Sequence, residues 1–177
     1  MKKIVFGITS LTLGGAERVL VDIANKLKNE YDITIFELYG GGEFEKDLDK
    51  EIKLESMYHH SYASMNVIKR KWASLKVLLR KKHLYKKYIQ GRYDIEIAFL
   101  EGPITRLFSV RSDNTRKIAW IHNDISKVYG NSRSSYLKKK ADEKAYINYD
   151  ELVFVSKDNL AVFNKEYAEV KRNRKDT

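Results

Sequence analysis

Two spacings of apolar residues alternate along this chain. Short apolar runs rich in β-branched residues recur, and the segments between them place apolar residues every three or four positions. The first spacing predicts buried strands and the second predicts amphipathic helices. The predicted strands are residues 4–8, 31–38, 52–57, 93–100, 117–121 and 152–155. The predicted helices are residues 16–27, 66–90, 103–110, 132–148 and 157–166.

This order of strands and helices predicts an α/β fold, a Rossmann-like three-layer αβα domain with a mostly parallel sheet. Several strands are apolar on both sides, as strands covered by helices on both faces are. We expect one domain over residues 1–170 and the start of a linker over residues 171–177. Because ligands of such folds lie at the carboxyl ends of the strands, four loops are candidates for the site. They are residues 9–15, 100–103, 122–127 and 156–158.

Composition narrows the class of protein. The 177 residues are 43% hydrophobic, which is enough for one domain with a sizeable core. Cysteine does not occur, which excludes disulfides and thiolate metal sites and fits a reducing, cytoplasmic compartment. The first apolar run is too short for a signal peptide, and no run approaches the roughly 18 apolar residues of a membrane span.

The net charge of +10 comes from one segment of the sequence. Between Glu55 and Asp94 there is no acidic residue and there are ten basic ones, whereas bases and acids balance in the rest of the chain. A patch of this kind favours an anionic partner, which is a membrane surface, a phosphorylated lipid or a nucleic acid.

The predicted helix 66–90 carries most of this charge. We expect its apolar stripe, which includes Ile68, Trp72, Leu75 and Leu79, to pack on the sheet. We expect its cations to face an anionic surface such as that of a membrane. The cations expected to make this contact are Lys69, Arg70, Lys71, Arg80, Lys81 and Lys82.

The loop after the first strand places two glycines, Gly14 and Gly15, where the first helix begins. Without Cβ atoms the backbone can approach a ligand closely, and the first N–H groups of the helix can bind an anion. The alternative is that a strand-to-helix turn merely tolerates glycine here. Neither the Gly-x-Gly-x-x-Gly fingerprint nor the Gly-Lys-Ser/Thr of a P-loop occurs, which disfavours nicotinamide dehydrogenases and P-loop nucleotidases.

Three polar residues follow other buried strands. His122 either contacts a ligand, since neutral imidazole donates or accepts a hydrogen bond near pH 7, or caps backbone groups of its loop. Glu101 either binds a sugar hydroxyl or is a surface residue of a tight turn. Ser156 is predicted to cap the helix that begins at Lys157.

Other chemistries lack their signatures. The four histidines have no ligand spacing to one another or to a carboxylate, so no metal is expected. The Gly-x-Ser-x-Gly turn of α/β-hydrolases is also missing.

Three segments together resemble one family. They are Leu-Gly-Gly-Ala-Glu-Arg-Val-Leu at 13–20, Ile-Ala-Trp-Ile-His-Asn-Asp at 118–124 and Val-Phe-Val-Ser-Lys at 153–157. In this order they resemble the group 1 glycosyltransferases, the retaining family 4 enzymes of the GT-B fold. The resemblance covers essentially the whole chain, and its most specific part is the Gly-Gly-Ala-Glu-Arg element.

The resemblance implies that this chain is the N-terminal, acceptor-side half of a GT-B enzyme. The missing C-terminal half would carry a Glu-x7-Glu motif and most of the nucleotide site. Gly14 and Gly15 would lie under the donor phosphates and the acceptor, and His122 would lie beside the donor sugar. Glu17 would be architectural, while Glu101 is a candidate by position alone.

The resemblance also implies the partners. A nucleotide-sugar would be the donor, a saccharide or lipid-linked saccharide the acceptor, and no metal or other cofactor would be needed. The products would be capsule, lipopolysaccharide or other cell-surface polysaccharide, built in the cytoplasm at the inner face of the bacterial membrane.

Other functions stay open at this point. A nucleic-acid-binding module fits the sequence pI of about 9.5 but lacks any known nucleic-acid-binding signature, so nucleic acid is not expected as a partner. A non-catalytic α/β module that binds a nucleotide or carbohydrate is the other alternative. A nicotinamide oxidoreductase ranks below both, because its fingerprint is missing.

Overall fold

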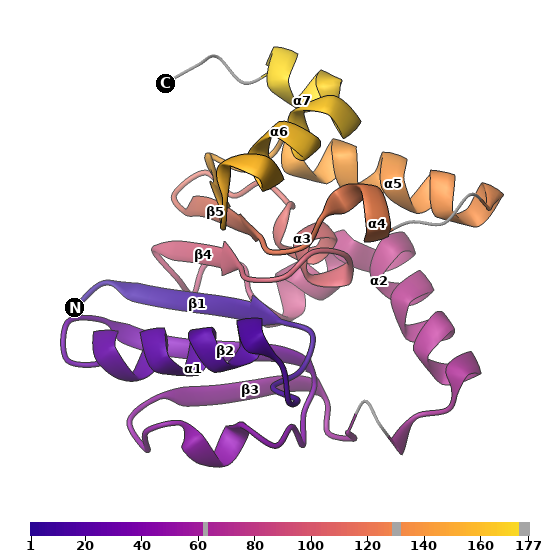
Figure 1. Cartoon of the computed structure of the whole chain (residues 1–177). Helices are drawn as coiled ribbons and strands as arrows, with labels where there is room; N and C mark the ends of the chain where they lie inside the picture. The colour runs from indigo at the N-terminus through magenta and orange to yellow at the C-terminus, as the bar shows by residue number, and fades with distance from the viewer. Residues whose placement is uncertain (62–63, 129–131, 174–177) are drawn as a thin grey trace.

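The computed structural model describes residues 1–61, 64–128 and 132–173, which form one six-stranded sheet flanked by helices (Figure 1). All strand pairs are parallel, and the strand order is β3-β2-β1-β4-β5-β6. The strands are β1 (Lys3–Ile8), β2 (Asp32–Tyr39), β3 (Lys53–Tyr58), β4 (Ile95–Ala98), β5 (Arg116–Ile121) and β6 (Glu151–Phe154). The predicted α/β fold with a parallel sheet is confirmed.

Five longer helices were predicted from the sequence, and all five are present. They are α1 (Gly15–Leu27), α2 (Val67–Tyr88), α3 (Pro103–Phe108), α5 (Arg133–Tyr146) and α6 (Lys157–Glu166). Three further elements were not predicted, because two of them are about one turn long and the third crosses the boundary of the expected linker. They are η1 (Glu45–Asp47), α4 (Ile125–Val128) and α7 (Ala168–Asn173). Helix α7 crosses position 170, and residues 174–177 of the predicted linker lie outside the described residues.

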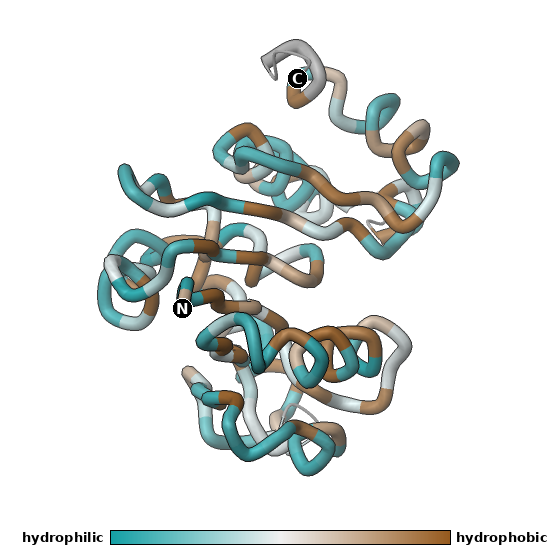
Figure 2. The backbone as a smooth tube through the Cα atoms, turned by 90° about the vertical axis from the view of Figure 1, so that its left-hand side faces the viewer, coloured by the Kyte–Doolittle hydropathy of each residue, from teal (hydrophilic) through white to brown (hydrophobic). Residues whose placement is uncertain are grey.

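Two apolar layers cover the two faces of the sheet. Helix α1 buries Leu20, Val21 and Ala24 against strand residues such as Ile33 and Ile35. The opposite layer is larger and includes buried residues of α2, α3, α5, α6 and α7. Polar positions gather on the outer turns of the tube in Figure 2, and apolar ones run along the interior strands.

Helix α2 departs from the predicted packing. The residues that it buries are Ala73, Val77, Leu84 and Tyr85. The expected core stripe is exposed instead: the exposed fractions are 66% for Ile68, 67% for Trp72, 42% for Leu75 and 73% for Leu79. The expectation that the stripe packs on the sheet is therefore wrong for the first half of the helix, whereas Tyr85 and Ile89 at its other end are buried as expected.

A kink explains this departure. Arg80 has non-helical backbone angles (φ −117°, ψ 18°), so the two halves of α2 do not share one continuous face. The second half is fixed in the core, where the Tyr85 hydroxyl donates to Glu96 Oε1 at 2.7 Å and Lys117 forms a buried ion pair with Glu96. The first half extends toward the edge of the molecule (Figure 1), with its larger apolar side chains in solvent.

Candidate functional site

The sheet topology defines where a ligand would bind. The chain reverses its direction of strand addition between β1 and β4, which are hydrogen-bonded neighbours. In open parallel sheets, ligands bind at such a switch point, outside the carboxyl ends of the strands. The loops after β1, β4 and β5 therefore border the candidate site, and they contain Gly14, Glu101 and His122.

The loop after β1 ends in two glycines with different surroundings. Gly14 is the N-cap of α1, has extended backbone angles (φ −166°, ψ 162°) and provides no side-chain cap. A Cβ atom on Gly14 would overlap the Glu17 carboxylate, which folds back over it, whereas a Cβ on Gly15 would meet open space. Gly14 thus makes room for Glu17, and Gly15 leaves the start of α1 open to a ligand.

The His122 side chain is held in an aromatic cage after β5. Its ring centroid lies 4.8 Å from that of Phe99 and 5.8 Å from that of Trp120. Burial lowers the pKa of His122, and this outweighs the charges of Glu101 and Glu17, which raise it. The ring is therefore neutral at pH 7, and its Nε2 atom is buried without a hydrogen-bond partner.

Glu101 fixes the loop that carries His122. Its Oε1 accepts the backbone N–H of His122 at 2.6 Å and that of Asn123 at 2.7 Å. Its Oε2 accepts the Asn123 side-chain amide at 2.7 Å. The structure therefore brings Glu101 and His122 together, with the carboxylate engaged by the protein rather than free in solvent.

The start of α6 closes the site on its β6 side. Ser156 caps this helix by accepting the N–H of Asn159 at 3.1 Å, which confirms the predicted cap. The Asn159 side-chain amide donates to the Asn123 carbonyl at 3.1 Å. The two adjacent loops at the ends of β5 and β6 are thus tied to each other.

Buried polar atoms without a partner concentrate at this edge of the sheet. Among the described residues, the carboxyl-edge loops and strand ends contribute Ser10 Oγ, Glu37 Oε2, His122 Nε2 and Asn159 Oδ1. Buried polar groups in folded proteins are nearly always paired, so a cluster of exceptions indicates a place where a ligand or ordered water completes the set. Such atoms suit a ligand that is rich in hydroxyl groups.

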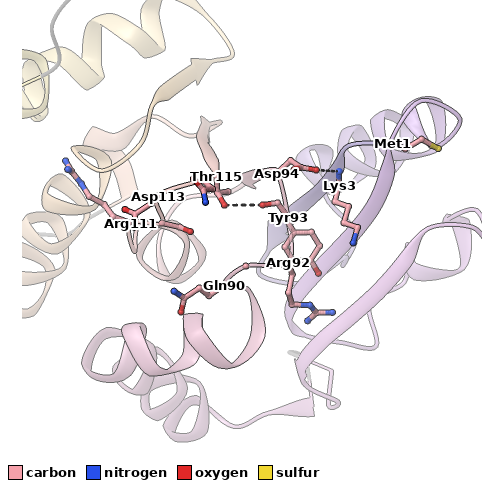
Figure 3. Close-up of a pocket in the computed structure, with 12 residues that line it drawn as sticks. Met1, Lys3, Gln90, Arg92, Tyr93, Asp94, Arg111, Asp113 and Thr115 are labelled. Carbon is pink, nitrogen blue, oxygen red and sulfur yellow. Dashed lines mark hydrogen bonds between the residues drawn. The ribbon is translucent and has the colours of Figure 1, made fainter.

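The opposite edge also has a depression, and several of its polar groups are paired within the protein (Figure 3). The Lys3 backbone N–H donates to Asp94 Oδ2 at 2.7 Å, and the Thr115 hydroxyl donates to the Tyr93 carbonyl at 3.1 Å. Arg111 donates to Asn148 at 3.0 Å. This amino-edge pocket lies away from the switch point and offers a ligand little beyond exposed side chains.

The predicted cations of α2 lie on a separate surface. Lys69, Lys71, Arg80 and Lys82 are exposed, and Arg70 and Lys81 are partly buried. Burial lowers the pKa of Lys81, whose ammonium lies 3.4 Å from the Ser109 hydroxyl. The structure thus presents four of the six side chains fully to solvent.

Sequence reasoning missed two acids near the site. Glu17 was taken as architectural, yet its carboxylate covers Gly14 and its charge acts on His122. Glu37 was not considered, although an acid within the apolar run of β2 was a signal: it is fully buried and accepts the Leu11 N–H at 2.6 Å. Both carboxylates adjoin the loop after β1.

The described residues place no group of three or more His, Asp or Glu side chains where they could hold a metal ion. The groups best suited to an anion are the N–H groups in the first turn of α1, which no side chain caps. In the described part of the chain, no helix combines the length and apolar character needed to cross a bilayer.

A comparison with known proteins supplies one relative. A 57-residue segment is 44% identical to the GalNAc-α-(1→4)-GalNAc-α-(1→3)-diNAcBac-PP-undecaprenol α-1,4-N-acetyl-D-galactosaminyltransferase of Campylobacter jejuni. The match covers 32% of this chain and 16% of the relative's length, so the similarity is confined to a short segment of both proteins. No protein-family profile matches the chain.

Proposed function

We propose that this chain is the acceptor-side domain of a retaining glycosyltransferase of the GT-B fold. It transfers a sugar from a nucleotide-sugar donor to a saccharide or lipid-linked saccharide, and a second domain supplies most of the donor site. The observation that carries the proposal is the buried, unpartnered Nε2 atom of a neutral His122 at the switch point of the sheet. The segment shared with a galactosaminyltransferase supports it.

His122 acts on the transferred sugar in this proposal. A neutral imidazole packed against the stacked rings of Phe99 and Trp120 has one ring nitrogen without a partner, and a sugar hydroxyl satisfies it in this proposal. Because the ring and its loop are already fixed, the imidazole itself does not need to reorient as charge develops at the anomeric carbon. Glu101 acts through the loop and is a positioning residue.

The start of α1 faces the leaving diphosphate in this proposal. Its first N–H groups lack a side-chain cap, and the space over Gly15 is open. A helix N-terminus stabilises negative charge, so it lowers the energy of the departing phosphate without a metal ion or another cofactor. Glu17 lies at the same place and would have to turn aside when the phosphate binds.

The test uses the complete enzyme with His122→Ala. We expect turnover, measured as release of nucleoside diphosphate from a panel of nucleotide-sugars, to fall about 100-fold or more. The free energy of unfolding should change much less than the turnover. Unchanged turnover with a folded variant would remove His122 from the site.

The first half of α2 places the protein at an anionic membrane in this proposal, at the inner face of the cell membrane. Trp72, Leu75 and Leu79 line an apolar groove whose other lining residues include the cations Lys69, Lys76 and Arg80. Exposed tryptophan and leucine beside lysine and arginine is the composition of helices that lie in a membrane interface. Each cation near an anionic leaflet contributes about 1 kcal/mol.

Vesicle binding tests this orientation. Trp120→Phe leaves Trp72 as the single tryptophan, so its emission should shift to the blue with anionic vesicles. We expect less binding to neutral vesicles and less binding at high salt, because exposed charges are screened. Equal binding to both vesicle types, or binding unchanged by Trp72→Ala and Leu79→Ala together, would contradict the proposal.

A further inference from the structure

A second cavity opens at the carboxyl ends of β2 and β3, and Gly14 and His122 are not among its lining residues. Its volume is about 610 Å³, within the range of small-molecule sites. Six residues matter for its chemistry: Glu37, Gly40, Gly41, Glu45, Ser56 and His59. None of them belongs to the segments that resemble a known family.

Polar side chains converge over Gly40 in this cavity. A Cβ atom placed on Gly40 would lie 3.1 Å from Ser56 Oγ and 3.7 Å from Glu45 Oε1. The Ser56 hydroxyl is itself hydrogen-bonded to His59 Nδ1 at 3.0 Å. A hydroxyl, a carboxylate and an imidazole thus surround a position that the glycine leaves empty.

Glu37 adds a buried group that the protein satisfies only in part. It is fully buried, and its Oε1 accepts the Leu11 N–H, but its Oε2 has no hydrogen-bond partner. Burial keeps this carboxyl mostly protonated at pH 7, so its second oxygen is a hydroxyl donor, which the neighbouring Glu45 carboxylate or a ligand hydroxyl at the cavity wall can accept. The carboxyl group of Glu37 at the cavity wall therefore favours binding of a polar molecule.

The charges of the cavity determine which polar molecule fits. Of the three acids that line it, Glu55 is paired with Arg92, so the charge that disfavours a phosphate or a nucleotide is that of Glu45. Burial raises the pKa of Glu37 to about 8, so at pH 7 this carboxyl is mostly neutral and does not require a cation. Glu45 already accepts the N–H groups of Gly41 and Gly42. An uncharged ligand with several hydroxyl groups satisfies all these conditions.

We propose that the cavity bounded by Glu37, Gly40 and Ser56 binds an uncharged, hydroxyl-rich saccharide unit. That this unit is part of the acceptor rests on the proposed function, whereas the preference for an uncharged polyol rests on the cavity alone. The site lies on the acceptor-side domain but two strands away from β4, so it holds a sugar distant from the reacting bond.

Amide chemical shifts of the 177-residue chain test this site. Titration with N-acetylgalactosamine at millimolar concentration should shift the amides of Gly40, Gly41, Ser56 and His59. Inorganic phosphate should leave the same amides unmoved. Galactosamine, the matched amine, should bind no more tightly than the N-acetylated sugar.

Variants identify the groups that bind. Ser56→Ala removes one hydrogen bond and should weaken binding about tenfold, while Gly40→Ala fills the space and should weaken it at least as much. Ser134→Ala, on the exposed start of α5, removes a hydroxyl elsewhere and should have no effect. Affinity unchanged in both Ser56→Ala and Gly40→Ala would overturn the proposal.

The same sample separates this proposal from the proposed function. Uridine diphosphate should shift the amides of Gly14, Gly15 and His122 but not those of Gly40 and Ser56. If the sugar shifts only the loops of Gly14 and His122, the second site is overturned while the transferase remains. If phosphate or galactosamine binds the cavity more tightly than the sugar, the assignment to an uncharged saccharide is overturned.

Discussion

The two edges of the sheet differ in how completely their polar groups are paired. At the amino edge, a carboxylate (Asp94) accepts the backbone N–H of Lys3, and the neighbouring hydroxyl and guanidinium groups also find protein partners. At the carboxyl edge, a carboxylate (Glu101) accepts backbone N–H groups in the same way. Here, however, His122 Nε2 and Glu37 Oε2 are buried without partners.

Unpaired buried polar atoms locate a binding site better than a depression in the surface does. Both edges have concave surface, so shape alone does not locate a site. Because a folded chain pairs nearly all its buried polar atoms, the atoms left over indicate where an external molecule contributes the missing bonds. By this criterion the carboxyl edge is the better candidate for a binding site than the amino edge.

The most direct test of this comparison replaces the carboxylate that accepts backbone N–H groups at each edge, Glu101 at the carboxyl edge and Asp94 at the amino edge. Glu101→Ala should lower turnover of the complete enzyme about 100-fold, because the loop of His122 loses its three hydrogen bonds and shifts. Asp94→Ala removes the matched clamp at the amino edge and should leave turnover within about twofold, a change of only about 0.4 kcal/mol in transition-state stabilisation. Similar turnover losses in both variants would mean that the edges do not differ in function.

Alanine variants of two glycines at the carboxyl edge test which part of this edge is tightly packed and which part is open. A Cβ on Gly42 would overlap the Leu11 carbonyl, so Gly42→Ala should destabilise the chain by about 2 kcal/mol. A Cβ on Gly15 meets open space, so Gly15→Ala should change stability by no more than about 0.5 kcal/mol. Urea unfolding measures both, and equal losses would show that the loop after β1 is not open as described.

The buried acid of the carboxyl edge should make stability depend on pH. Burial raises the pKa of Glu37 from 4.5 to about 8, so the folded chain keeps a proton that the unfolded chain releases. The free energy of unfolding should therefore fall by about 1 kcal/mol per pH unit from about pH 4.5 to 8 and level off above that. Asp142, whose pKa burial raises to about 6, contributes a fall of the same sign below pH 6, so Glu37→Gln should remove the dependence between pH 6 and 8. Parallel curves for the two proteins in that range would contradict the assignment.

Much of the fold followed from apolar spacing. The strands and longer helices are long enough to show a period, and the parallel sheet follows from their alternation. The packing of α2 could not be predicted in this way. Ile68, Trp72 and Leu79 have helical spacing whether they face the core or the solvent. Only the kink at Arg80 and the small buried residues Ala73 and Val77 reveal which face is inside.

The position of the candidate site in the fold could be predicted from the sequence, but the contacts between its residues could not. His122 and Glu101 follow strands, so their location at one edge could be predicted from order alone. That Glu101 would bond the backbone of His122 depends on β4 and β5 being neighbours, which the sequence order suggests but does not prove. Glu37 could not be assigned, because its role depends on a backbone N–H from a different loop.

The kink at Arg80 divides α2 into two halves, which we expect to open independently of each other. The residues after it are held by Leu84 and Tyr85 in the core, so their amide protons exchange with solvent only when the whole domain unfolds. The residues before it bury little beyond Ala73 and Val77, so they exchange through local fraying at far lower cost. The protein can therefore lose or regain the helical order of its exposed arm while the site at the sheet edge remains assembled.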